Sequence, residues 1–166
     1  VGGVLQYIPG VNYIGAGPVS MHVFHQLMSY KGPKAIMGIS QSIAYLLELG
    51  VGLDESARND FRVAMYGTGV LTPTVHADLK ETYPNISILS YFAATQAEAI
   101  GLQLDHTSPL LASVPGLHFI EIVDEEGRWV DEGEEGELVV TRLHATEVPV
   151  LRFKIGDRMI RRPNID

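Results

Sequence analysis

The order of apolar segments changes character near residue 110, and this change constrains the fold more than any other feature. Before it, short apolar segments typical of strands alternate with segments of helical periodicity, a pattern characteristic of α/β architecture. After Pro115-Gly116, strand patterns follow one another with only turns between them, which favours an antiparallel sheet or a partial barrel. We therefore expect an α/β subdomain with a Rossmann-like layered sheet and helices over residues 1–112, incomplete at its N-terminus. A small antiparallel β subdomain is expected over residues 113–166.

In the first part, helix signals are caps and apolar positions at 3–4 spacing, and strand signals are β-branched apolar runs. Ser20 is expected to cap a helix that runs to about Tyr30. Thr72-Pro73 is expected to open another, because a proline at the first helical turn loses no hydrogen bond. The remaining expected elements are strands Lys34–Gly38, Arg62–Tyr66 and Ile86–Tyr91 and a helix from Ser40 or Ser42 to Gly50.

In the second part, the expected strands are Leu117–Val123, Trp129-Val130, Glu137–Arg142, Val150–Lys154 and Arg158–Arg162. The turns between them are expected at 124–128 and at Gly156-Asp157. Residues 124–137 carry eight acids and one arginine. A calcium site there is conceivable, but the alternating ligand spacing of a calcium loop is absent. Because the acids flank turn glycines at Gly127, Gly133 and Gly136, solvated hairpin tips are the better interpretation.

Composition excludes several classes of protein. Apolar residues make up 46% of the chain and charged residues 19%, which is a globular rather than a disordered composition. No apolar run approaches the ~18 residues of a membrane span, and no Lys/Arg cluster is present for nucleic-acid binding. The absence of cysteine is compatible with a cytoplasmic protein. The chain begins at Val1 without a secretory signal, and we expect it to be a piece of something longer.

Taken alone, no single motif identifies the chemistry. His22 and His25 share one helix face, but an i,i+3 pair without a further carboxylate is a weak metal signal. A Gly-x-Ser-x-Gly elbow is absent, which disfavours an α/β-hydrolase. Gly67-Thr68-Gly69 lies between an expected strand and an expected helix, where backbone amides can face a ligand. A plain turn is the alternative interpretation.

The order of several segments along the chain is more informative than any single motif. They are Gly67-Thr68-Gly69-Val70-Leu71-Thr72-Pro73, Tyr91-Phe92-Ala93-Ala94-Thr95-Gln96-Ala97-Glu98, Glu134–Thr141 and Pro149–Asp157. This order resembles the AMP-forming acyl-adenylate superfamily, and most closely its phenylacetate–CoA ligase group. Glu135–Thr141 and Arg152–Asp157 carry the most specific match, to a Gly-Glu-Gly-Glu-Leu-type stretch followed by Arg-Tyr-x-x-Gly-Asp. The resemblance spans roughly residues 32–162.

The resemblance implies roles for individual residues. Gly67, Thr68 and Gly69 would line an adenine ring, with Tyr91–Ala93 on its other face. The Thr95 hydroxyl would contact the α-phosphate and take part in catalysis. Asp157 would accept hydrogen bonds from both ribose hydroxyls, a task that suits the two oxygens of a carboxylate. Gly38 and Ser40 would border the acyl pocket.

Each of these roles has a structural alternative. Tyr91 and Phe92 are equally compatible with the core of a strand. Thr95 is compatible with a helix cap, and Asp157 with a turn beside Gly156.

The sequence also departs from the family. The motif aromatic-Gly-x-Thr-Glu appears as Phe92-Ala93-Ala94-Thr95-Gln96, so an amide stands where the family holds magnesium with a carboxylate. A neutral amide binds a hard dication less well, and Glu98 is a possible substitute. Neither the upstream phosphate loop nor the small C-terminal domain with its catalytic lysine is found.

By resemblance, the parent protein would be an AMP-forming acid–CoA ligase that uses ATP, Mg²⁺ and coenzyme A. A small carboxylic acid attacks the α-phosphate of ATP, pyrophosphate leaves, and a thiol then takes the acyl group from the AMP adduct. We expect the chain alone to be inactive, and its candidate partners are the missing C-terminal domain and a second copy of the chain. Two alternatives remain open, namely an acyl-protein or carrier-protein synthetase and a degenerate, non-catalytic nucleotide- or acyl-binding module.

Overall fold

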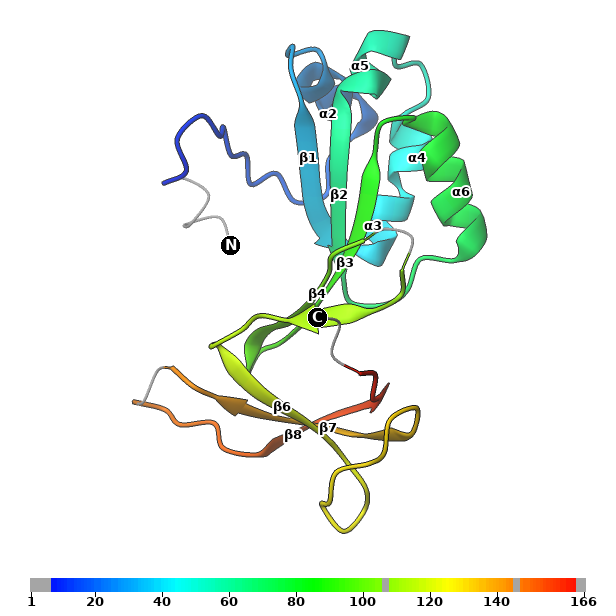
Figure 1. Cartoon of the computed structure of the whole chain (residues 1–166). Helices are drawn as coiled ribbons and strands as arrows, with labels where there is room; N and C mark the ends of the chain where they lie inside the picture. The colour runs from blue at the N-terminus through cyan, green and yellow to red at the C-terminus, as the bar shows by residue number, and fades with distance from the viewer. Residues whose placement is uncertain (1–6, 106–107, 145–146, 164–166) are drawn as a thin grey trace.

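The structure is a computed structural model that describes residues 7–105, 108–144 and 147–163. Two sheets organise it, as Figure 1 shows: a five-stranded sheet of order β1-β2-β3-β4-β5 and a three-stranded sheet of order β6-β7-β8. Helices accompany only the first sheet. The expected succession of an α/β sheet and a small antiparallel sheet is therefore confirmed. Among the described helices, none combines the length and the apolar character needed to cross a bilayer.

The first sheet is mixed. Its parallel strands are β1 (Lys34–Ile39), β2 (Phe61–Gly67) and β3 (Ser87–Ala94). Two further strands, β4 (Glu98–Gln103) and β5 (Leu111–Ser113), continue the sheet in antiparallel fashion. The sequence analysis placed the first three strands and missed the last two. β4 contains a glycine and one β-branched residue, and β5 has three residues, so neither gives a strong local strand signal.

The helices are α2 (Met21–Met28), α3 (Ser40–Ala44), α4 (Leu46–Leu49), α5 (Glu55–Asp60) and α6 (Pro73–Thr82). The side chains of Ser20, Asp54 and Thr72 cap α2, α5 and α6 by accepting a hydrogen bond from the backbone N–H three residues later. The single helix expected up to Gly50 is wrong in detail. It is divided at Tyr45 into two short helices, because apolar periodicity does not distinguish one helix from two that bury the same face.

The main core lies between the parallel strands and the helices, and α3, α4 and α6 lie on one side of the sheet in Figure 1. Register partners in a parallel pair present side chains to the same face. Ile36, Ala64 and Ile88 share the face toward the helices. The opposite face carries Met37 and Met65, and Met37 is 40% exposed.

The second sheet consists of β6 (His118–Val123), β7 (Glu135–Arg142) and β8 (Phe153–Ile160). Its inner face forms a second core in which Leu138 and Val140 from β7 pack with Ala97 and Ile100 from the preceding sheet. β4 therefore contributes to a core shared by the two sheets.

Two details of the second sheet correct the sequence analysis. The strands expected on either side of Gly156-Asp157 form one strand, β8, with both residues inside it. Opposite the single residue Leu138, β8 places three residues, 155–157, so the strand contains a bulge. Gly136 lies within β7 and not in a turn. A β-carbon at Gly136 would lie 2.6 Å from the Val123 carbonyl oxygen, so the glycine permits close approach of two strands.

Candidate functional site

The predicted site residues of the first part gather at the carboxyl ends of β1, β2 and β3. Ser40 follows β1 directly, Thr68 and Gly69 follow β2, and Tyr91 lies in β3 after its last partner on β2. In open α/β sheets, ligands bind in the crevice outside the carboxyl ends of the strands. The topology therefore brings these residues to the edge where a ligand is expected.

The loop after β2 is held in place by the side chain of Ser40, the residue directly after β1. Thr68 and Gly69 have φ values of 57° and 89°. This left-handed conformation favours glycine, so Thr68 is conformationally strained. The buried Ser40 hydroxyl donates a hydrogen bond to the Thr68 carbonyl oxygen at 2.8 Å. A β-carbon at Gly69 would lie 2.7 Å from Ser40 Oγ. Ser40 thus fixes the conformation of the loop that was predicted to line adenine.

Tyr91 and Phe92 point to opposite faces of β3, as neighbours in a strand do. The ring of Tyr91 lies against Gly67, where a β-carbon would be 2.7 Å from Tyr91 Cζ. Phe92 packs against the second core, and Ala93 is exposed. Of the three residues predicted to cover adenine, Tyr91 is therefore the one in direct contact with the Gly67–Gly69 loop.

A shallow hollow of about 160 Å³ lies beside this loop. It is lined by Ser40, Gln41, Ala44, Val70, Leu71, Thr72 and Val75. Gly38 lies two residues before Ser40 in the sequence. A β-carbon added at Gly38 would lie 3.3 Å from Ser42 Cβ. Pockets that bury a whole small molecule measure ~300–1,000 Å³. The described chain therefore offers one wall of a site and not an enclosed pocket.

The predicted phosphate and magnesium residues lie in the turn between β3 and β4. Thr95 and Gln96 are exposed there, and the turn is closed by a hydrogen bond from the Ala97 N–H to the Ala94 carbonyl oxygen, at 3.1 Å. Glu98 follows with a φ of 60°. Its Oε1 is 3.2 Å from Arg142 Nη2 and its Oε2 is 3.3 Å from His144 Nε2.

These residues do not fit a magnesium site. Gln96 contributes a neutral amide, and the two carboxylate oxygens of Glu98 already face Arg142 and His144. Mg²⁺ in nucleotide sites relies on one or two carboxylates together with phosphate oxygens. Within the described ranges, no group of three or more His, Cys, Asp or Glu side chains is placed to hold a metal ion.

Asp157 lies in the β8 bulge of the second sheet, beside Gly156 with a φ of 93°. Its carboxylate is exposed and forms no hydrogen bond or ion pair with the described part of the chain. A bulge changes the direction of a side chain relative to a regular strand. Asp157 is therefore available to an external ligand, and it forms no hydrogen bond or ion pair with the Gly67–Gly69 loop.

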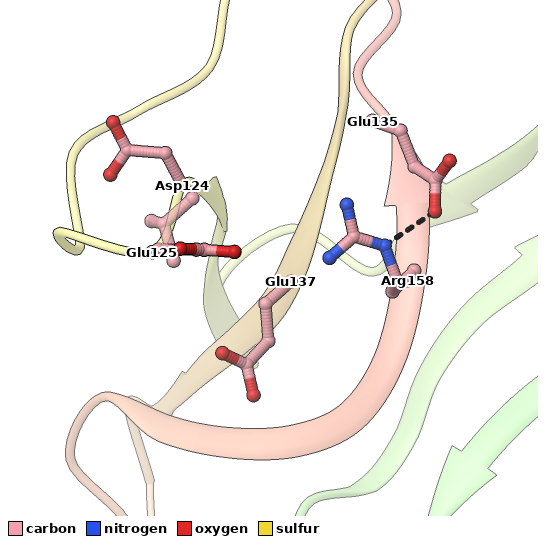
Figure 2. A pocket seen from close by; sticks show the side chains of 6 residues that line it. Asp124, Glu125, Glu135, Glu137 and Arg158 are labelled. Carbon is pink, nitrogen blue, oxygen red and sulfur yellow. Dashed lines mark hydrogen bonds and ion pairs between the residues drawn. The ribbon is translucent and has the colours of Figure 1, made fainter.

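An acidic hollow of about 180 Å³ lies in the second sheet, and Figure 2 shows the side chains around it. Its carboxylates are largely paired. Glu135 binds Arg158, and Glu137 Oε2 is 2.6 Å from Lys154 Nζ. Hydrogen bonding by the backbone N–H of Arg128 lowers the pKa of Asp124, and the side chain of Arg128 adds to this effect. Asp124 lies in the turn after β6, as predicted, whereas Glu135 and Glu137 lie within β7 and not at a hairpin tip.

Sequence reasoning missed one ionic contact of the signature segments. The Glu121 side chain is 7% exposed, and its Oε2 accepts a hydrogen bond from Arg152 Nε at 3.1 Å. Arg152 also donates to the Gly127 carbonyl oxygen at 2.9 Å. The signature arginine thus ties β6 to the segment before β8. The apolar composition of β6 was the only available signal, since it places Glu121 between two isoleucines.

The fold of this chain is similar to part of a CoA ligase of known structure. Among solved structures, 2-hydroxyisobutyryl-CoA ligase in complex with 2-HIB-AMP and CoA superposes with a TM-score of 0.68 at 17% identity, over 84% of this chain and 31% of that one. VinN in complex with L-aspartate gives a TM-score of 0.62 at 18% identity, over 83% and 37%. Apo MatB from Rhodopseudomonas palustris gives 0.63 at 16%, over 75% and 25%.

The resemblance to AMP-forming ligases drawn from the sequence is thereby confirmed at the level of the fold. The chain spans about a third or less of the ligase chains that head the comparison. No family model and no curated protein matches the sequence.

Proposed function

We propose that the chain is the nucleotide-binding portion of an AMP-forming acid–CoA ligase of the phenylacetate–CoA ligase type. The observation that carries this proposal is the meeting of Ser40, the Gly67–Gly69 loop and Tyr91 at one sheet edge, in a fold shared with a ligase that holds an acyl-AMP. The subdomain division at residues 112/113 and a cytoplasmic location belong to the same proposal. The absence of cysteine agrees with that location.

Each residue then has a defined task in the proposed function. Gly67–Gly69 presents backbone to the adenine edge, and Tyr91 supports that loop. The Thr95 hydroxyl donates a hydrogen bond to the α-phosphate, where negative charge develops as the acid attacks. Asp157 accepts from the ribose hydroxyls. The exposed positions of Thr95 and Asp157 leave both side chains accessible to a nucleotide.

The test is calorimetric titration of the 166-residue chain with AMP and with ATP. We expect weak binding, because the hollow is open and the chain forms one wall only. Asp157→Asn is expected to weaken AMP binding about tenfold or more, since a charge-assisted hydrogen bond contributes ~1.5–3 kcal/mol. The matched control is Asp131→Asn, an acid of the hairpin tips. Equal affinity of the wild type and Asp157→Asn for AMP would remove Asp157 from the site.

A second candidate function, a non-catalytic nucleotide- or acyl-binding module, is favoured by one observation. Gln96 stands where the family has a carboxylate, and Glu98 is paired with Arg142 and His144. Pyrophosphate exchange by the full-length parent, with a panel of aryl and aliphatic acids, separates the two functions. Exchange with any acid supports the ligase. No exchange in the wild type, together with activity gained by Gln96→Glu alone, supports the binding module.

A further inference from the structure

The carboxylate of Glu98 lies between the side chains of Arg142 and His144, which come from the end of β7 and the segment after it. Arg142 is the last residue of β7 and approaches Oε1, whereas His144 follows two residues later and approaches Oε2. Glu98 itself begins β4 in a left-handed conformation with a φ of 60°. A glutamate held in that conformation requires compensating contacts, and the two ion pairs supply them.

Both ring nitrogens of His144 lie within hydrogen-bond distance of an oxygen acceptor. Nδ1 is 3.2 Å from the Leu117 carbonyl oxygen and Nε2 is 3.3 Å from Glu98 Oε2. Both neighbours are acceptors, so only the doubly protonated ring donates to both at once. The other charged or titratable groups that face the ring are Arg142, through the shared carboxylate, and His118 on β6. The rings of His118 and His144 meet edge-on at 5.8 Å.

We propose that Glu98 is a positioning residue that links the β3–β4 turn to the second sheet through Arg142 and His144, and that it does not hold a metal ion. The turn carries Thr95 and Gln96 three and two residues before Glu98. Fixing the carboxylate therefore fixes the backbone from which the Thr95 hydroxyl projects. The assignment of this turn to the nucleotide site rests on the proposed function, whereas the link itself does not.

Metal binding and this link compete for the same atoms. A hard dication needs a free carboxylate oxygen. In Glu98, Oε1 faces the Arg142 side chain and Oε2 faces the His144 ring. Arg142 is 13% exposed at its side chain, and its Nε is buried without a partner within the described residues. Releasing Glu98 to a metal would leave the largely buried Arg142 guanidinium without its anion, which is costly.

The first test is thermal unfolding of the 166-residue chain and of Glu98→Gln at about pH 5.5 and about pH 8.5, on either side of the ordinary histidine range. We expect Tm to fall by about 3–6 °C at the lower pH and by less at the higher pH, because a neutral imidazole carries a single N–H and can donate to only one of the two acceptors beside it. Glu135→Gln, which breaks the exposed pair with Arg158, is the matched control and should change Tm little at either pH.

His144→Gln provides the second variant. It should remove the pH dependence of the Glu98→Gln effect and leave the part due to Arg142. A loss of Tm that is the same at both pH values would overturn the assignment of His144 to the link, and no loss at either pH would overturn the link itself.

The second test measures how AMP and ATP affinity depend on magnesium concentration in the wild type and in Glu98→Gln. We expect affinity to fall about threefold to tenfold in the variant, because the turn is less well fixed, with the same magnesium dependence in both proteins. Loss of the magnesium dependence in Glu98→Gln would show that Glu98 binds the metal and overturn the proposal. If neither protein binds nucleotide, the proposed function fails, and the unfolding experiment still decides whether Glu98 links the two sheets.

Discussion

The ring of Tyr91 occupies the space that a side chain at Gly67 would need. A β-carbon at that position would lie 2.7 Å from Cζ, 2.8 Å from Cε2 and 3.1 Å from Oη of Tyr91. Gly67 is thus required for close approach alone, whereas Gly69 is required both for its φ of 89° and for the close approach of Ser40 Oγ. The two glycines of one short motif therefore differ in the physical reasons that they are glycine.

Gly67→Ala should destabilise the chain by about 1–3 kcal/mol, because the new methyl group displaces the Tyr91 ring or moves the strand. Urea denaturation measures the change in the free energy of unfolding. In a Tyr91→Ala background the same substitution should cost less than about 1 kcal/mol. An equal cost in both backgrounds would show that the ring is not what excludes the side chain.

Ser40→Ala should cost about 1 kcal/mol, because it removes the hydrogen bond to the Thr68 carbonyl oxygen. Thr68 is strained with a φ of 57°, so the loop is also expected to lose order, which hydrogen exchange at Val70 and Leu71 would report. Ser42→Ala is the control, because Ser42 is exposed. Unchanged exchange in Ser40→Ala would show that the loop holds its conformation without this bond.

Arg152→Met should destabilise the chain by about 2 kcal/mol or more, since it leaves the buried carboxylate of Glu121 without its partner. The comparison is Arg158→Met, whose pair with Glu135 is exposed on both sides and should contribute less than about 1 kcal/mol. Denaturation midpoints of the two variants give the answer directly. Equal small effects would assign the signature arginine a role outside stability.

The stability of the chain should depend on Tyr83 at high pH. Burial raises the pKa of Tyr83 to about 12, with a smaller opposing effect from the charge of Arg58. The unfolded chain loses this proton near pH ~10, so the stability linked to Tyr83 is fully present below about 10 and decreases as pH rises toward about 12.

Tyr83→Phe tests this dependence. At neutral pH it should cost about 1 kcal/mol, because the hydroxyl donates to the Leu46 carbonyl oxygen at 2.7 Å. The difference in unfolding free energy between wild type and variant should shrink as the pH is raised from about 9 to about 11.5. Tyr30→Phe, at an exposed position, should show no such trend. A difference that stays constant with pH would contradict the raised pKa.

Local signals predicted most of the first sheet, because each depends on residues close together in the chain. Ser20 and Thr72-Pro73 mark the starts of α2 and α6, and short apolar segments mark β1 to β3. The short α5 was missed although Asp54 caps it, because it buries no residue and has no apolar face. β8 was divided in two because Gly156-Asp157 has the composition of a turn.

The candidate site was predictable only in part. The resemblance to a ligase family placed Gly67–Gly69 and Tyr91 at the same site, and the fold confirms that family likeness. The partners of Glu98 lie 44 and 46 residues away, and no periodicity reports a contact across two sheets. A hydrogen bond such as that from Ser40 to Thr68 likewise depends on the register of β1 with β2.

The bulge in β8 determines which deletions that strand can accommodate. Glu137 pairs with Arg158 and Val139 with Lys154, so β8 holds two residues more than a regular ladder needs. Deleting Gly156 and Asp157 together would leave Ile155 opposite Leu138 and Arg158 opposite Glu137, with every later side chain still on its present face. Deleting only one of them would leave two residues opposite Leu138, which is the arrangement of an ordinary bulge. Asp157 thus lies in a two-residue insertion that the pairing of β7 with β8 does not need. The architecture of the second sheet therefore does not depend on the Asp157 carboxylate.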